Sequence, residues 1–261
     1  MKKLWQKQWF GIKFEESFEI SSKALPNSSF YNSFYQEFFK KFSGYNDLDK
    51  NWLFKKDMVF KWIFSHLNRG DSVLSIGSGL GYIEQKLWIK GGENNINIHV
   101  SDFASDSLKW LKQVIPDENI HEPSEIKNLT NLYFDLIYLS TVDYALDNKT
   151  FIEILSEYSG KLSNKGRIVI ISASLLSVTQ FQSVIGKIKD FIKAFLEILG
   201  FRSRGQFWGW SRTKDDYLRI LKKAGLESIQ HGFIEENNQQ IFWISGELSS
   251  TKKMLSIKGD N

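Results

Sequence analysis

The sequence predicts an α/β protein whose central sheet is mostly parallel. Short β-branched runs alternate with amphipathic segments between residues 71 and 172, which is typical of parallel strands joined by crossover helices. Two further apolar runs flank the short turn 235–238, so the last strand should run antiparallel to the strand before it. A helical N-terminal cap over residues 1–69 and an inserted lid helix within residues 175–210 complete the predicted architecture.

The N-terminal cap is predicted from its aromatic residues. They recur every three or four positions, as in Tyr31, Phe34, Tyr35 and Phe38, which is the pattern of an amphipathic helix with one buried face. Most rings in such a pattern serve core packing, and contact of one or two of them with a substrate is the alternative.

The main domain is expected to cover residues 70–248. Its strands are expected at 72–76, 96–100, 119–122, 134–139, 167–172, 227–234 and 239–247. Its helices are expected from Tyr82, through Leu108 and Leu111, over 150–162, and from a capping sequence at Thr213 to Gly225. Sheets of this kind bind ligands at the carboxyl ends of their strands, where the connectivity reverses.

The insertion over residues 175–210 is expected to form the lid. Its apolar positions share one helical face, opposite Lys187, Lys189 and Lys193. We expect this helix to pack on its own domain, and contact with an anionic membrane surface is the less common alternative. The polar tail 249–261 is expected to be flexible.

The composition argues against several kinds of site and partner. The 261 residues include no Cys, which excludes disulfide scaffolds, cysteine nucleophiles and thiolate metal ligands. The four His show no metal-ligand spacing, so no metal site is expected. A net charge of +4 falls short of the basic stripe of a nucleic-acid binder, so no nucleic-acid partner is expected. No apolar run suits a signal peptide or a membrane span, and a cytoplasmic protein is expected.

A glycine-rich turn at Gly77, Gly79 and Gly81 is the most informative motif. It joins a buried strand to a helix, so the backbone can approach a ligand closely and the first N–H groups of the helix can face it. Asp102 stands 102 − 81 = 21 residues beyond the last glycine, at a predicted strand end, where its carboxylate can accept ribose hydroxyl protons. Its alternative role is to cap the next helix. Tyr82 replaces the third glycine of the dinucleotide fingerprint, which argues against NAD.

The sequence resembles the class I S-adenosylmethionine-dependent methyltransferases over most of residues 70–248. Residues 74–81 look like the first motif of that family, and 100–102 look like its ribose-binding acid. The similarity continues at the fourth strand (134–140), the turn into the fifth strand (160–171) and the approach to the last hairpin (221–227). The resemblance implies a Rossmann-like, seven-stranded sheet and S-adenosyl-L-methionine as the cofactor.

The resemblance also implies which residues hold the cofactor. They are Ser75, Gly77, Ser78, Gly79, Gly81, Asp102, Phe103 and Ser140. Glu122 is the candidate for contact with adenine, and Ser124 and Glu125 are the alternatives. Ser75 stands where the family usually carries an Asp or Glu that contacts the amino group of the methionine moiety. Serine can hydrogen-bond there but brings no charge.

The implied reaction moves a methyl group from a sulfonium to a nucleophile, which requires alignment and exclusion of water. Asp143 is the candidate base or orienting group, with Tyr144 beside it. The alternative is that Asp143 caps a loop while Tyr144 packs. Trp208, Trp210 and Arg212 are the candidate acceptor-binding residues, because indoles stack on flat ligands and guanidinium groups hold anions. Their alternative role is to pack the insertion onto the core, with the arginines in solvent.

The predicted function is thus methyl transfer to a small polar acceptor, such as a hydroxyl of a sugar or glycan precursor. Relatives that methylate amino groups of bases carry Asn-Pro-Pro-Tyr after the fourth strand, and this chain does not. The alternatives are a catalytically idle, methyltransferase-like binding subunit and a methyltransferase that acts on a protein or nucleic acid.

Overall fold

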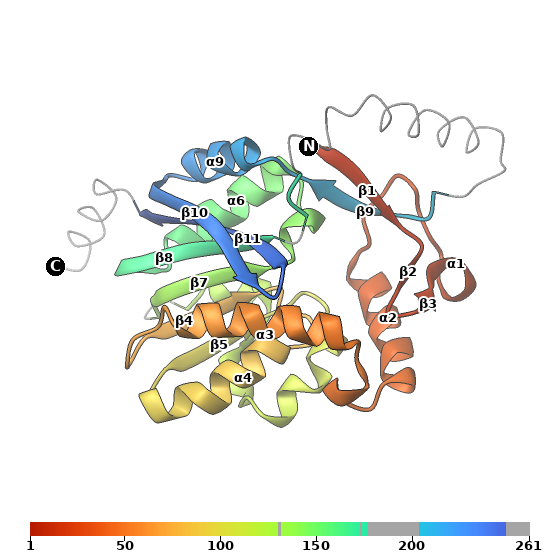
Figure 1. The fold of residues 1–261 in the computed structure, drawn as a ribbon, viewed down its shortest axis with the longest axis horizontal. Coiled ribbons are helices and arrows are strands. Elements are labelled where there is room, and N and C mark those ends of the chain that lie inside the picture. The colour runs from red at the N-terminus through yellow and green to blue at the C-terminus, as the bar shows by residue number, and fades with distance from the viewer. Residues whose placement is uncertain (130–131, 173, 177–203, 249–261) are drawn as a thin grey trace.

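The computed structural model describes residues 1–129, 132–172, 174–176 and 204–248. A seven-stranded sheet forms the centre of the molecule, in the order β10-β11-β8-β7-β4-β5-β6 (Figure 1). Its strands are β4 (Ser72–Ile76), β5 (Asn97–Ser101), β6 (Ile120–His121), β7 (Phe134–Ser140), β8 (Leu162–Ser172), β10 (Leu226–Glu236) and β11 (Gln239–Leu248). The predicted α/β fold with a mostly parallel, seven-stranded sheet is confirmed.

The pairing of the strands shows where a ligand site is expected. β4 through β8 run parallel, whereas β11 pairs antiparallel with both β8 and β10, as the short turn before it predicts. The chain passes from β4 outward to β5 and β6, and then crosses back so that β7 pairs with the other side of β4. The strand order therefore reverses around β4, and the carboxyl ends of β4, β5 and β7 are the expected place for a ligand.

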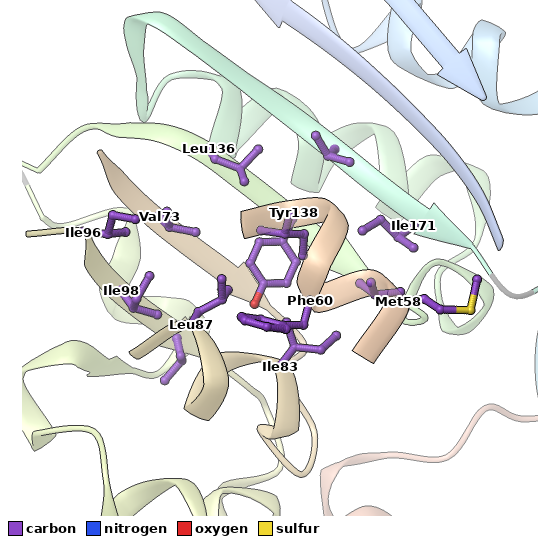
Figure 2. Close-up of a cluster of buried hydrophobic side chains, with 14 of the residues drawn as sticks. Met58, Phe60, Val73, Ile83, Leu87, Ile96, Ile98, Leu136, Tyr138 and Ile171 are labelled. Atoms are coloured by element: carbon purple, nitrogen blue, oxygen red, sulfur yellow. The ribbon is translucent and has the colours of Figure 1, made fainter. Parts of the chain in front are cut away.

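Helices cover both faces of this sheet. One face packs on α3 (Lys50–Phe64) and α4 (Tyr82–Gly91), through a core that includes Met58, Leu87 and Tyr138 (Figure 2). The other face packs on α6 (Asn148–Ser159) and α9 (Lys214–Lys223). We call the sheet together with these four helices the sheet half.

Short polar signals fix the ends of the covering helices. Asp147 accepts a hydrogen bond from the Thr150 backbone at 2.8 Å and thereby caps α6. Thr213 and Asp216 form a reciprocal capping box at the start of α9, as the sequence predicts. Between β5 and α6 the helical elements of the described residues are all short: η3 (Ser105–Lys109), η4 (Leu111–Gln113), η5 (Asp117–Asn119), α5 (Pro123–Ile126) and η6 (Asp143–Ala145). The helix expected through Leu108 and Leu111 is thus two 3-10 turns.

A separate layer, which we call the N-terminal lobe, consists of residues 1–47 and β9 (Gln206–Ser211). It contains β1 (Lys2–Gln6), β2 (Gln8–Trp9), β3 (Ile12–Lys13), α1 (Phe14–Ser17), α2 (Ser28–Lys41) and η1 (Tyr45–Asp47). β1 pairs antiparallel with β9, so two segments about 200 residues apart in the chain lie side by side (Figure 1). Residues 206–210, expected to belong to the lid insertion, are therefore part of a strand of this lobe. The expected cap over 1–69 is divided within α3: Trp52 and Leu53 pack against the lobe, whereas the helix from Met58 onward packs on the sheet.

Two expectations concern parts of the chain outside the described residues. The lid helix falls mostly on 177–203, and the tail falls on 249–261. Within the described ranges, no helix has the length and apolar character needed to cross a membrane.

Candidate active site

The glycine turn between β4 and α4 has three left-handed residues with different tasks. Gly77, Gly79 and Gly81 have φ values of +70°, +57° and +73°. A Cβ atom on Gly77 would lie 2.7 Å from Val142 Cγ2, and one on Gly81 would lie 2.8 Å from Leu111 Cδ1. A Cβ on Gly79 would meet only the Tyr35 hydroxyl, at 3.4 Å. Gly77 and Gly81 therefore permit close packing, whereas Gly79 borders the cavity described next.

A cavity of about 420 Å³ lies at the carboxyl ends of β4, β5 and β7, which is within the usual range for ligand pockets. The sheet half contributes the glycine turn, the segment from Asp102 to Ala104 that follows β5, and the end of β7 with the residues after it. The N-terminal lobe closes the cavity with aromatic side chains. The cavity therefore lies where the two regions of the molecule meet.

Asp102 joins the two strand ends. Its Oδ2 accepts a hydrogen bond from the Gly79 backbone N–H at 2.8 Å, and its Oδ1 accepts one from Ala104 at 2.9 Å. Burial raises the pKa of Asp102, while these two backbone donors oppose that shift. A carboxylate has about four acceptor positions, so each oxygen can accept one further proton from a ligand hydroxyl.

Three more of the predicted cofactor residues line the cavity. The hydroxyl oxygens of Ser78 and Ser140 are buried and have no hydrogen-bond partner among the described residues. Phe103 is 47% exposed, with its ring 5.3 Å from that of Tyr31. Two orphaned hydroxyls, a glycine without a side chain and an exposed ring are features that a polar, partly flat ligand would complete.

Ser75 lies behind the cavity rather than in its wall. It is buried, and its Oγ donates to Glu84 Oε1 at 2.6 Å. The Tyr138 hydroxyl donates to the same oxygen at 2.7 Å. Glu84 itself lines the cavity, 2% exposed, and burial raises its pKa against the effect of the two hydroxyl donors. Sequence reasoning missed Glu84, because a glutamate in the first turn of a helix is ordinarily read as favourable to the helix dipole.

Lys56 was also missed. It extends from α3 to the cavity, where its Nζ donates to Thr141 Oγ1 at 3.1 Å. Burial lowers the pKa of Lys56 to about 8, and the nearby carboxylate of Glu84 opposes that shift. Thr141 has a φ of +60°, a strained conformation for a β-branched residue and one that clusters at functional sites.

Aromatic side chains form the wall opposite the sheet. Tyr144 stacks on Trp208 with ring centroids 6.1 Å apart and an interplanar angle of 14°. Trp9 and Tyr31 each lie 5.7 Å from the Trp208 ring. Burial raises the pKa of Tyr31 and raises that of Tyr144 to about 12. These phenols are therefore neutral hydrogen-bonding groups at ordinary pH.

The structure does not place Asp143 as a base. Its side chain is fully buried and does not line the cavity. Its Oδ2 accepts hydrogen bonds from Ser172 Oγ at 2.8 Å and from the Tyr217 hydroxyl. Burial raises the pKa of Asp143, while these donors oppose the shift. The side chain turns into the sheet half, so it cannot meet an acceptor; Tyr144, the next residue, faces the cavity instead.

Arg212 and Trp210 likewise lie outside the cavity wall, contrary to the expectation that they contact an acceptor. Arg212 is fully buried, and its guanidinium donates to the Asp143 backbone oxygen at 2.6 Å, to Asn148 Oδ1 at 3.0 Å and to the Leu146 oxygen. Trp210 packs against Phe207, with ring centroids 5.2 Å apart, away from the cavity. The β1–β9 register shifts within β9, which breaks the alternation that would put Trp208 and Trp210 on one face.

Glu122 does not contact the cavity either. It is exposed, and its backbone N–H donates to Glu125 Oε2 at 2.9 Å at the start of α5. Ser124 and Glu125 are exposed and also lie outside the cavity wall. β6 has only two residues, so these side chains follow it on the outer edge of the sheet and serve α5 instead.

Comparison with solved structures identifies the fold. Magnesium protoporphyrin IX methyltransferase from Synechocystis PCC 6803, with bound SAH, matches with a TM-score of 0.57 and 14% identity over 85% of this chain and 98% of its own. Human N-acetylserotonin methyltransferase in complex with SAM gives 0.53 and 15% over 86% of this chain and 57% of its own. A TehB-like SAM-dependent methyltransferase from Corynebacterium glutamicum ATCC 13032 gives 0.52 and 16% over 85% and 100%.

At these identities the likeness establishes the fold, which is that of the class I SAM-dependent methyltransferases. This chain spans nearly the whole bacterial structures but little more than half of the human one. No family model and no curated protein sequence matches it.

Proposed function

We propose that this protein is an S-adenosylmethionine-dependent methyltransferase that acts on a hydroxyl of a small acceptor. The observation that carries the proposal is the hydrogen bond from the Gly79 backbone to the Asp102 carboxylate in the wall of the cavity. A class I methyltransferase fold with this pair at its carboxyl edge suits an adenosyl ligand, because the carboxylate can accept ribose hydroxyls while Gly79 leaves room for the ligand.

The described residues supply the remaining contacts for such a cofactor. The exposed ring of Phe103, next to Asp102, can stack on the purine base. The orphaned hydroxyls of Ser78 and Ser140 can hydrogen-bond to the bound ligand. When bound, the cofactor supplies a methyl group already activated on a sulfonium sulfur. The protein is then left with alignment of the acceptor and exclusion of water.

The aromatic wall is the proposed acceptor side of the cavity. Trp208 and Tyr144 offer flat surfaces, and the hydroxyls of Tyr144 and Tyr31 offer hydrogen bonds. Because these phenols stay protonated at neutral pH, they orient an acceptor rather than remove its proton. A sugar hydroxyl and an aromatic hydroxyl both suit such a wall, since aromatic side chains stack on either.

Methyl transfer from labelled S-adenosylmethionine tests the proposal. The purified chain is incubated with separate panels of sugars, glycan precursors and phenols, and transfer is followed by mass spectrometry. We expect a mass increase of one methyl group on at least one hydroxyl compound, and Gly79→Val should abolish it. Cofactor binding without transfer to any acceptor would favour the idle binding subunit, which the burial of Asp143 makes the second candidate.

A further inference from the structure

The cavity wall includes a buried acid and a half-buried amine, and the adenosyl and acceptor contacts use neither of them. Glu84 reaches it from α4 and Lys56 reaches it from α3. Each side chain shifts the pKa of the other. Among the described residues, however, the carboxylate of Glu84 accepts from two hydroxyls and Lys56 donates to a third, so they form no ion pair with each other. An acid and an amine that line the same cavity without forming an ion pair can each bind the opposite charge of a zwitterionic ligand.

Glu84 is costly to bury and is nevertheless held firmly in place. Taking a carboxylate out of water without a paired cation costs several kcal/mol. Two hydroxyl donors from neighbouring strands, Ser75 of β4 and Tyr138 of β7, both bind Oε1 and fix the side chain. A buried carboxylate that is fixed by hydrogen bonds and lines a cavity is typical of a group that binds a cationic ligand.

Lys56 has the complementary placement. One hydrogen bond is described for its Nζ, to Thr141 Oγ1 directly after β7. An ammonium group has three donors, so donors remain for a ligand carboxylate. The Thr141 hydroxyl is itself held in place, because it donates to the Ser140 backbone oxygen at 2.6 Å.

We propose that Glu84 and Lys56 form a clamp for the α-amino acid end of the cofactor, with Glu84 on its ammonium group and Lys56 on its carboxylate. The clamp rests on the proposed function, since it assigns one end of the same ligand. Ser75 is then a positioning residue that orients Glu84. The acid that the family usually carries at position 75 of the strand is replaced here by an acid on helix α4. This explains how a neutral residue stands at position 75 without loss of negative charge from the cavity.

A pair of ligands isolates the clamp. S-adenosylhomocysteine and 5′-methylthioadenosine share the adenosine and the thioether, but only the former carries the amino acid. Glu84→Gln keeps the shape of the side chain, and Lys56→Met keeps its length. Each should weaken binding of S-adenosylhomocysteine about 10- to 100-fold, the usual worth of a hydrogen bond to a charged group. Binding of 5′-methylthioadenosine should stay within about twofold.

Calorimetric titration of the full chain measures both affinities, with Lys61→Met on the same helix and Glu153→Gln on α6 as controls. Lys61 and Glu153 are exposed and lie away from the cavity, so both controls should bind as the wild type does. If one clamp variant fails to fold, as judged by thermal unfolding, the other still decides.

The outcomes separate the clamp from the proposed function. Unchanged binding of S-adenosylhomocysteine by either folded variant overturns the clamp, and so does an equal loss for both ligands, which would indicate a structural role. In either case binding by the wild type leaves the cofactor site standing. If the wild type binds neither ligand, the proposed function fails and the clamp fails with it.

Discussion

The sheet half and the N-terminal lobe build their cores from different side chains. The sheet packs mainly aliphatic residues, such as Val73, Ile98 and Leu136, against its helices. The lobe packs rings, such as Phe34, Phe38 and Trp208, and one of its strand pairs joins segments about 200 residues apart in the chain. A regular aliphatic pattern fixes strand register and therefore the residues at strand ends, whereas a ring cluster takes its geometry from contacts far apart in sequence.

This difference divides the cavity into two sides. The sheet half contributes the polar groups at its strand ends, chiefly Asp102 and the glycine turn, which suit a cofactor. The lobe contributes Trp9, Tyr31 and Trp208, which suit an acceptor. Substitutions in the two regions should therefore affect different quantities, and the following predictions test this division.

The largest effect is expected where the two regions are joined. The guanidinium of Arg212, directly after β9, donates to three oxygens around η6 and α6, so Arg212→Met leaves buried acceptors unpaired. We expect a loss of about 3–5 kcal/mol in the free energy of unfolding, measured by urea denaturation. Arg219→Met, which removes an exposed guanidinium, is the matched control and should cost less than about 1 kcal/mol. Similar losses of unfolding free energy for both variants would show that Arg212 does not hold the two regions together.

The second largest effect is a pH dependence of stability that arises from histidine. It is expected in the sheet half alone, because no His lies in the lobe. His99 Nδ1 lies 2.8 Å from His121 Nε2, and burial, followed by the neighbouring imidazole, lowers the pKa of His99 from 6.5 to about 4. The unfolded chain then binds the extra proton between pH 6.5 and 4, so stability is full above pH 6.5 and is lost as the pH falls. The loss amounts to at most about 3 kcal/mol.

His99→Gln removes this titration. Unfolding free energies of the two chains, measured from pH 7 to pH 5, should converge as the solution is acidified. Parallel curves would show that His99 is not held neutral by its surroundings.

The smallest effect is expected in the lobe-facing wall. Tyr144→Phe keeps the ring that stacks on Trp208 and removes the hydroxyl that can orient an acceptor. We expect the KM for the acceptor to rise by a factor of about 3–10 while cofactor affinity stays unchanged. Tyr133→Phe, at an exposed position, is the control. A loss of cofactor affinity in Tyr144→Phe would contradict the assignment of the cofactor to the sheet half and of the acceptor to the aromatic wall.

Strand patterning was sufficient to predict the sheet and the residues at its ends. The pattern placed Asp102 and the glycine turn at one edge, because parallel strands bring their carboxyl ends together. Sequence reasoning could not show which way a strand-end side chain turns. Asp143 follows β7 as Asp102 follows β5, yet it points toward Ser172 and Tyr217, partners that only the folded chain brings near.

Charged residues that become buried were the other source of error. Arg212 was expected to contact solvent or substrate, but its acceptors lie more than 60 residues earlier in the chain. Glu84 and Lys56 follow ordinary helical patterns, and only the approach of α3 and α4 to one sheet face reveals that both reach the cavity. Local pattern does not encode such pairings, since they depend on tertiary packing.

Calorimetric titration of the full chain with S-adenosylhomocysteine, alongside Gly79→Val, tests the cofactor site most directly. The wild type should bind with a stoichiometry of one. Gly79→Val places a branched side chain at the cavity border on a left-handed residue, so it should lose at least about 100-fold in affinity while remaining folded. Absence of binding by the wild type, or equal affinity of the two chains, would contradict an adenosyl ligand held between Gly79 and Asp102.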